Sequence, residues 1–160
     1  MAIEYDLEFA TKLSSAEVAT RLVEIGKDTG VLDASVTPEQ LTGLRVNSRL
    51  DTWMGVIQKR ELHSWHPIVT DLGFTPTVSV GFRMAKGVEV SDQQDDMLRL
   101  VLPLLEQVDG DAVLHYQFEQ IWLLRKNGDL TLSEDDDLWR PHRLPLVTQP
   151  YRRETHRFED

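Results

Sequence analysis

The strongest structural constraint in this sequence is an amphipathic helix predicted between residues 91 and 110. Ser91 is a suitable N-cap, aspartates follow near the positive end of the helix dipole, and Gly110 follows the last turn. Pro103 lies inside the pattern and predicts a kink or a second start there. An apolar stripe runs along one side of this helix: Met97, Leu98, Val101, Leu104, Leu105 and Val108. Such a stripe requires a second layer of structure to cover it.

Strand patterns supply that second layer. Residues 3–9 alternate apolar and mostly acidic side chains, which is typical of a half-buried strand. A helix follows, with Ser14 and Glu17 at capping-box spacing. Two more strands are predicted, from about 49 to 60 and from 77 to 85. The chain therefore alternates strand and helix before the long helix begins.

The sequence after the long helix predicts one long, bulged strand from residue 111, which Asn127-Gly128 turns into a short partner strand. The element order predicts an α+β fold: a ferredoxin-like βαββαβ core with two helices on one face of a mainly antiparallel sheet, followed by a C-terminal hairpin and an ordered coil tail. Residues 1–160 are expected to form a single domain. Residues 138–160, with five arginines against three acids, are expected to pack on it as an irregular tail.

Composition excludes several classes of function. The formal net charge of −10 disfavours nucleic acid as a partner, because phosphates require a basic surface. The chain has no cysteine, so disulfides, thiolate nucleophiles and cysteine-ligated zinc are excluded. No apolar run approaches the roughly 20 residues of a membrane span, and no secretory signal pattern or phosphate-binding loop is present. We therefore expect a cytoplasmic protein without a membrane anchor or a cofactor.

The stretch from residue 63 to residue 71 resembles a metal or catalytic site at first sight. His63 and His66 are three residues apart, and Asp71 follows them. Pro67 disfavours a helix here, and in an extended segment the two imidazoles point to opposite sides. We therefore predict no metal site and expect a structured connection between two strands. Four of its side chains are expected to pack it onto the sheet: Trp65, Pro67, Leu72 and Phe74.

An enzymatic alternative remains open. His115 and Glu119 are four residues apart and would face the same side of a regular strand, as in an acid–base pair. A small hydrolase or ligand-binding domain would use a cleft formed by these two residues and the 63–71 loop. The same spacing also fits a solvated strand face, so we assign no catalytic residues.

Two acidic clusters, at residues 92–96 and 133–137, are the remaining candidates for function. In one interpretation the first complements the dipole of its helix and the second is a solvated turn. In the other interpretation they form a negative surface that steers a basic partner protein. The residues predicted to contact a partner are Asp92, Asp95, Asp96, Glu134, Asp135, Asp136 and Asp137, together with His63, Trp65 and His66.

Several segments carry a resemblance to a known family: "HPIVTDLGFTPTVSVGFRM" (66–84), "QQDDMLRLV" (93–101), "GDAVLHYQFEQIWLLRKNGDLTLSEDDDLW" (110–139) and "PYRRETHRF" (150–158). They resemble immunity proteins of the swarming-inhibition toxin–immunity system, of the actinobacterial type. The resemblance implies a non-enzymatic cytoplasmic antidote whose partner is a cognate toxin delivered between sibling cells. A weak homodimer is an alternative association. The resemblance carries no residue-level binding motif.

Overall fold

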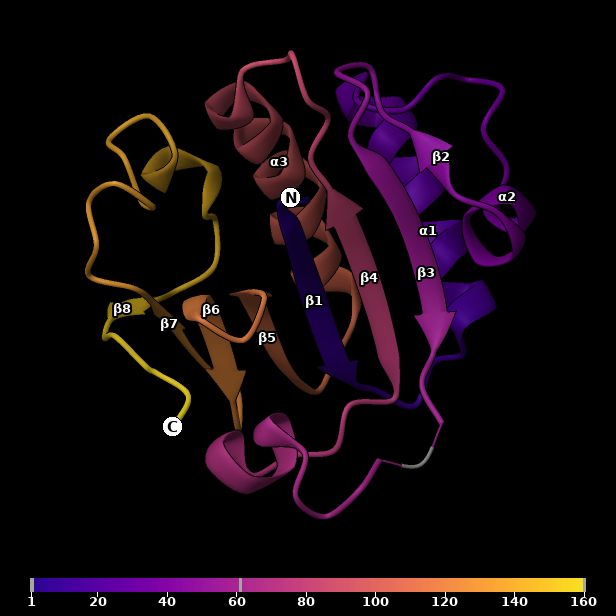
Figure 1. Cartoon of the computed structure of the whole chain (residues 1–160). Coiled ribbons are helices and arrows are strands. Elements are labelled where there is room, and N and C mark those ends of the chain that lie inside the picture. The colour runs from indigo at the N-terminus through magenta and orange to yellow at the C-terminus, as the bar shows by residue number, and fades with distance from the viewer. Residues whose placement is uncertain (1, 61, 160) are drawn as a thin grey trace.

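The computed structural model describes residues 2–60 and 62–159. The strands in these residues form one mixed sheet (Figure 1). Its strand order is β2-β3-β4-β1-β5-β6-β7-β8, and every pair is antiparallel except the last. The strands are β1 (Glu4–Ala10), β2 (Val46–Asn47), β3 (Trp53–Gln58), β4 (Val78–Arg83), β5 (Asp111–Tyr116), β6 (Gln120–Lys126), β7 (Asp129–Leu132) and β8 (Arg152–Arg153).

The predicted α+β architecture is confirmed. The core runs β1, α1 (Ser15–Thr29), β3, β4, α3 (Val90–Gln107), β5, and its strands stand in the order β3-β4-β1-β5. In each strand-helix-strand half, the two strands are not neighbours in the sheet, and one strand of the other half lies between them. This is the ferredoxin-like arrangement. Both helices lie behind the sheet in Figure 1 and pack against each other. The other face of the sheet is free of long helices.

One of the two predicted helix starts is confirmed. Ser14 and Glu17 form a reciprocal capping box on α1, and Thr37 with Gln40 forms a second one on α2 (Pro38–Gly43). The long helix differs in one detail, because Glu89 is its N-cap and not Ser91. The helix also runs through Pro103 without the second start that we considered.

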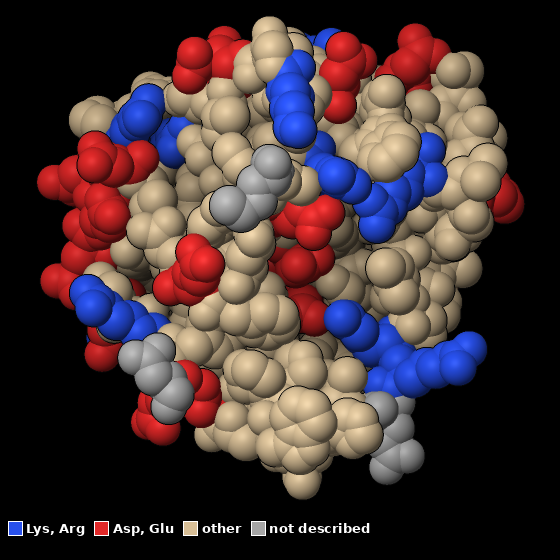
Figure 2. Space-filling model, in the orientation of Figure 1, with Lys and Arg blue, Asp and Glu red and all other residues tan. Residues whose placement is uncertain are grey.

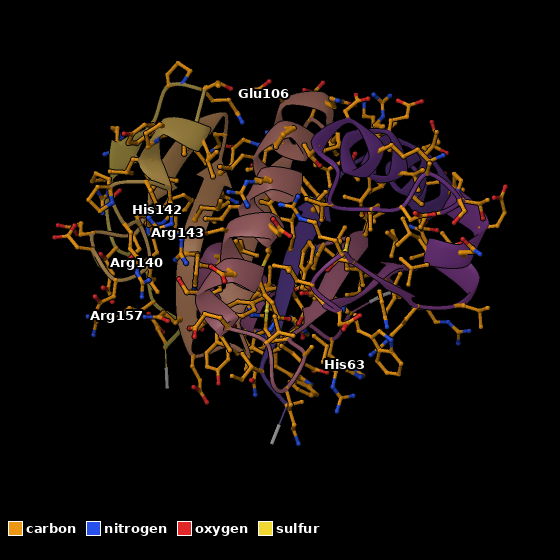
Figure 3. All side chains as sticks on the ribbon, turned by 90° about the horizontal axis from the view of Figure 1, so that it is seen from above. His63, Glu106, Arg140, His142, Arg143 and Arg157 are labelled. Carbon is orange, nitrogen blue, oxygen red and sulfur yellow. The ribbon has the colours of Figure 1, made fainter. Side chains whose placement is uncertain are left out.

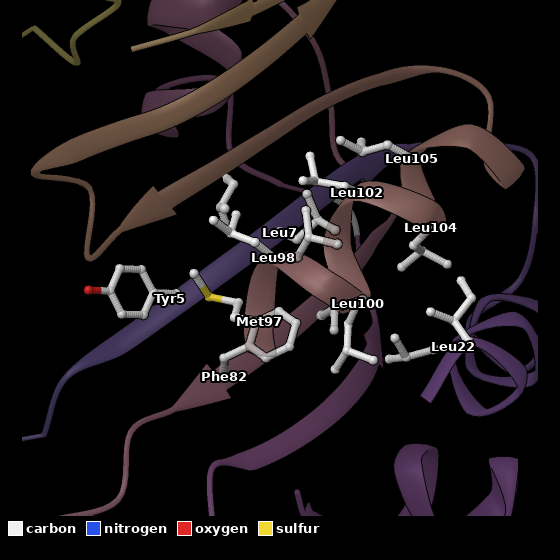
Figure 4. Close-up of a cluster of buried hydrophobic side chains, with 14 of the residues drawn as sticks. Tyr5, Leu7, Leu22, Phe82, Met97, Leu98, Leu100, Leu102, Leu104 and Leu105 are labelled. Carbon is white, nitrogen blue, oxygen red and sulfur yellow. The ribbon is translucent and has the colours of Figure 1, made fainter. Parts of the chain in front are cut away.

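The main core lies between the two helices and the sheet (Figure 4). Leu7 of β1 and Phe82 of β4 point toward α3, whose Leu98 and Leu100 are fully buried. Burying one such side chain contributes roughly 1.5–3 kcal/mol. The predicted stripe of α3 is thus the surface that holds the helix on the sheet.

The connection between β3 and β4 covers part of the other face. It contains one π-helical turn, η1 (Ile68–Leu72), so the prediction of no helix here was wrong; Pro67 precedes the turn, where its missing N–H removes no hydrogen bond. Leu72 and Phe74 are buried as expected, together with Ile68, against a second apolar cluster from β5 and β6. Trp65 is 71% exposed, so its predicted packing was wrong.

The predicted long strand after α3 is two strands. β5 ends at Tyr116, and the chain reverses through Gln117 and Phe118, which both have positive φ, before β6 begins at Gln120. A two-residue turn of this kind usually carries Asn or Gly. The Asn127-Gly128 turn that was predicted joins β6 to β7.

The C-terminal segment packs along the β7 edge and is not wholly irregular. It contains a 3-10 turn, η2 (Leu144–Leu146), and β8, which pairs in parallel with β7. Arg143 is fully buried and donates hydrogen bonds to Asp95, to the Leu138 carbonyl and to Ser91. Figure 3 shows Arg143 and His142 between this segment and α3. One buried guanidinium therefore joins this segment to α3.

Candidate functional site

Strand β1 carries three acids on the face of the sheet that the long helices leave free. Glu4, Asp6 and Glu8 alternate with Tyr5, Leu7 and Phe9, which point into the main core. Figure 2 shows acidic side chains in a column over β1, beside an area over β3 and β4 where uncharged residues lie between basic ones. The three carboxylates have different surroundings, and these differences define the candidate site.

Glu8 is buried and paired. Its carboxylate accepts a hydrogen bond from His115 Nε2 at 2.8 Å and lies 3.2 Å from Lys59 Nζ. Burial raises the pKa of Glu8, but His115 and Lys59 together outweigh burial and bring the pKa below its ordinary value. The backbone N–H of Phe118 donates to His115 Nδ1, which leaves the ring proton on Nε2 for Glu8.

His115 is not exposed to a cleft, as the enzymatic alternative requires. Its side chain is fully buried, with Phe118 and Phe158 packed against the ring. Glu119 is exposed on the turn beyond the end of β5, so it does not share a strand face with His115. Its carboxyl group lines a separate hollow that also contains His156. These residues do not form the cleft that this alternative requires.

Asp6 lies over a floor without side chains. Its strand neighbour is Gly81, and Gly81 stands opposite Gly55 on β3. These residues border a hollow of about 250 Å³ whose far wall is the segment 41–45. A Cβ on Gly81 would lie 3.4 Å from Asp6 Oδ1, so the carboxylate leans over the glycine. Gly55 and Gly81, which are neighbours across two strands, thus leave room beside the Asp6 carboxylate at the centre of the sheet.

The rim of this hollow combines exposed apolar side chains with charged ones. Leu44 is 73% exposed, Trp53 is 45% exposed and Ile57 is 55% exposed. Arg45 lies over the ring of Trp53, and Arg83 lies 3.8 Å from Glu4. Clusters of exposed large apolar side chains mark interaction surfaces more often than single ones do. We call the surface formed by Asp6, Trp53, Gly55, Ile57 and Gly81 the open face.

The first predicted acidic cluster is mostly engaged inside the chain. Asp96 is buried and accepts hydrogen bonds from Arg49 and Arg99, while Asp95 accepts from Arg143 and His142. The pKa of Asp95 lies below its ordinary value because these hydrogen bonds outweigh its burial. Asp92, in the first turn of α3, is exposed.

The second predicted cluster is exposed. Residues 134–137 form a turn after β7, where acidic side chains gather at the edge of the molecule in Figure 2. Glu134 exchanges hydrogen bonds with Thr155, and Asp136 lies 3.8 Å from Arg153. This cluster therefore both holds the C-terminal segment and presents charge to solvent.

The predicted residues of the connection divide between surface and interior. The rings of His63 and Trp65 stack with centroids 4.9 Å apart, and both are exposed. His66 is half-buried, and its Nδ1 accepts from the Ile68 N–H. Burial lowers the pKa of His66. Figure 3 places His63 far from Arg143, so the predicted partner residues do not form one contiguous patch.

Two further searches of the structure bear on chemistry. In residues 2–60 and 62–159, no group of three or more His, Asp or Glu side chains is arranged to hold a metal ion. None of the helices in the same ranges is both long and apolar enough to cross a membrane.

The comparisons with known proteins identify the family. The family model described as SitI3-like matches residues 3–143. The chain therefore belongs to the SitI3-like family, which is of the toxin-immunity type. Comparisons with curated proteins and with solved structures find no match. The resemblance of the sequence to swarming-inhibition immunity proteins is thus confirmed at the level of the family, and its actinobacterial type stays a prediction.

The open face was not among the predicted sites. The sequence placed Asp6 on the polar side of its strand, but acids at such positions usually face solvent and carry no signal of function. Gly55 and Gly81 each lie inside a strand, where glycine can mark a close approach of another molecule. Only the sheet order shows that the two glycines and Asp6 form one row.

Proposed function

We propose that this protein is a non-enzymatic, cytoplasmic immunity protein that binds a cognate toxin and neutralises it by protein–protein contact. The observation that carries the proposal is the family match over residues 3–143. The net charge of −10 suits a basic toxin domain, because complementary charge speeds association and disfavours other partners.

The geometry of the site favours binding over catalysis. The buried histidine, His115, is closed off by two phenylalanine rings, and its hydrogen bonds go to Glu8 and to the backbone. The exposed acids of residues 134–137 and the stacked pair His63–Trp65 remain available to a partner. We propose that these residues, with Asp92, contribute peripheral contacts to the toxin.

The experiment is a protection assay with a direct binding measurement. A candidate toxin chosen from the genes that flank this one is expressed in a sensitive host with and without this chain, and the purified pair is titrated by calorimetry. We expect growth to be rescued and a complex of defined stoichiometry to form. A chain that neither protects the host nor binds that toxin contradicts the proposed function.

A further inference from the structure

We propose that the open face is the anchor site for the toxin, and that the hollow over Gly55 and Gly81 receives one arginine or lysine side chain of that partner, which pairs with Asp6. This inference rests on the proposed function and adds the place of contact and the chemistry of the contacting group. The exposed apolar side chains Trp53 and Ile57 then contact the apolar neighbours of that basic residue.

The first argument is the geometry of the floor. Gly55, Gly81 and Asp6 stand side by side on three adjacent strands and line one hollow, whose wall at Gly55 is formed by the Arg45 side chain and the Leu41 carbonyl. Side chains two residues away in each direction, such as Trp53 and Ile57, stand on both sides of this row. A long, thin side chain can therefore enter between them and reach the carboxylate, and the absence of Cβ atoms allows its approach.

The second argument is that the Asp6 carboxylate has no side-chain partner of its own among the described residues. Among residues 2–60 and 62–159, no side chain forms a hydrogen bond or an ion pair with its carboxylate, whereas Glu4 and Glu8 both have basic partners. His115 is the neighbour of Asp6 on β5, but both ring nitrogens of His115 are already engaged. Burial raises the pKa of Asp6, so the charged form has an energetic cost in the free protein that a cationic partner would remove.

The third argument concerns the rim. Leu44, Trp53 and Ile57 account for three of the six large apolar side chains that are exposed in the described parts of the chain. Tryptophan and arginine are the residue types that most often dominate binding energy, and Trp53 stands here beside Arg45. A carboxylate beside exposed apolar side chains, with Arg83 already paired to Glu4, matches a contact that becomes desolvated on binding.

The test uses the candidate toxin of that protection assay as the probe, in calorimetric titrations against variants of the full chain. Asp6→Asn removes the charge without changing the shape, and Gly55→Val fills the floor with a residue that suits a strand. We expect each variant to weaken Kd by about tenfold or more. Asp28→Asn is the matched control, because Asp28 is exposed at the end of α1 and carries the same charge. It should leave Kd unchanged.

Three outcomes overturn the inference. If the wild-type chain binds the toxin and both open-face variants bind equally well, the anchor lies elsewhere and the proposed function stands. If the wild-type chain binds no toxin, the proposed function fails and this inference fails with it. If light scattering shows a homodimer that Gly55→Val dissociates, a second copy of the chain occupies the open face. Rescue of Asp6→Lys by a Lys→Glu or Arg→Glu change in the toxin would instead confirm the pairing.

Discussion

Asp6 and Glu8 are two residues apart on one strand and point to the same side of the sheet, yet their surroundings are opposite. Glu8 lies under the connection between β3 and β4 and has two partners, His115 and Lys59. Asp6 lies at the edge of a hollow with a glycine as its neighbour and without a partner of its own among the described residues. The first carboxylate stabilises the fold, and the second is available for recognition. Two carboxylates on the same face of one strand thus differ in role, and the segment that covers Glu8 but not Asp6 accounts for the difference.

The largest expected effect on the free energy of unfolding comes from the Glu8–His115 pair. His115→Leu keeps the volume of the side chain similar but leaves Glu8 with Lys59 alone and removes the acceptor of the Phe118 N–H. We expect a loss of about 3 kcal/mol in the free energy of unfolding, because a buried charge loses its donor. Denaturant unfolding measures it. The double variant with Glu8→Leu should recover part of the loss, and a single-variant loss below about 1 kcal/mol would show that the pair is not structural.

Acidic pH should remove the contribution of Glu8 to the free energy of unfolding. Its folded-state pKa lies below its unfolded value, so its stabilisation is complete above about pH 4.3 and is lost as the pH falls through the folded pKa. The wild-type protein should exceed Glu8→Gln by about 2 kcal/mol at pH 7, and the gap should narrow at pH 3. Chemical denaturation at both pH values measures the gap. A gap that stays constant would mean that the charge on Glu8 is unimportant.

The charged carboxylate of Asp6 should affect the free energy of unfolding with the opposite sign to that of Glu8. Its folded-state pKa is raised, so its charged form lowers stability above that pKa and the penalty disappears as the pH falls. Asp6→Asn should therefore raise the free energy of unfolding by about 1 kcal/mol at pH 7 while it weakens toxin binding. Thermal unfolding gives the comparison with Asp28→Asn. A destabilised Asp6→Asn variant would indicate that this carboxylate has a structural partner.

The smallest effect is expected at the floor of the open face. A Cβ at Gly55 meets the Arg45 side chain and the Leu41 carbonyl only at ordinary contact distances, and no positive φ is required there. Gly55→Ala should raise the free energy of unfolding by about 0.5 kcal/mol, because alanine loses less backbone freedom on folding than glycine does. Thermal unfolding is the measurement. A large loss of stability would show that the hollow is needed for folding.

The fold could be predicted from the sequence because its signals are local. Alternation in residues 3–9, the capping box at Ser14 and the apolar stripe of α3 each specify an element without long-range information. The β5–β6 reversal could not be predicted in this way. Gln117 and Phe118 adopt left-handed conformations that neither residue type favours, and tertiary packing of Phe118 on His115 accompanies that choice.

The candidate site was harder to predict because its residues are distant in sequence. Asp6, Gly55 and Gly81 come together only through the strand order. The acidic clusters were visible in the sequence, but the ion pairs of Asp95 with Arg143 and of Asp96 with Arg49 depend on tertiary structure. Whether the exposed members of both clusters contact a toxin stays a prediction.

The most direct test of this account is a single spectrum of the tryptophan indole N–H groups with and without the toxin. The chain has four tryptophans: Trp53 on the open face, Trp65 on the connection, and Trp122 and Trp139 in the core. We predict that toxin binding shifts the Trp53 signal strongly and leaves those of Trp122 and Trp139 in place. A toxin complex in which the Trp53 signal does not move would contradict the account.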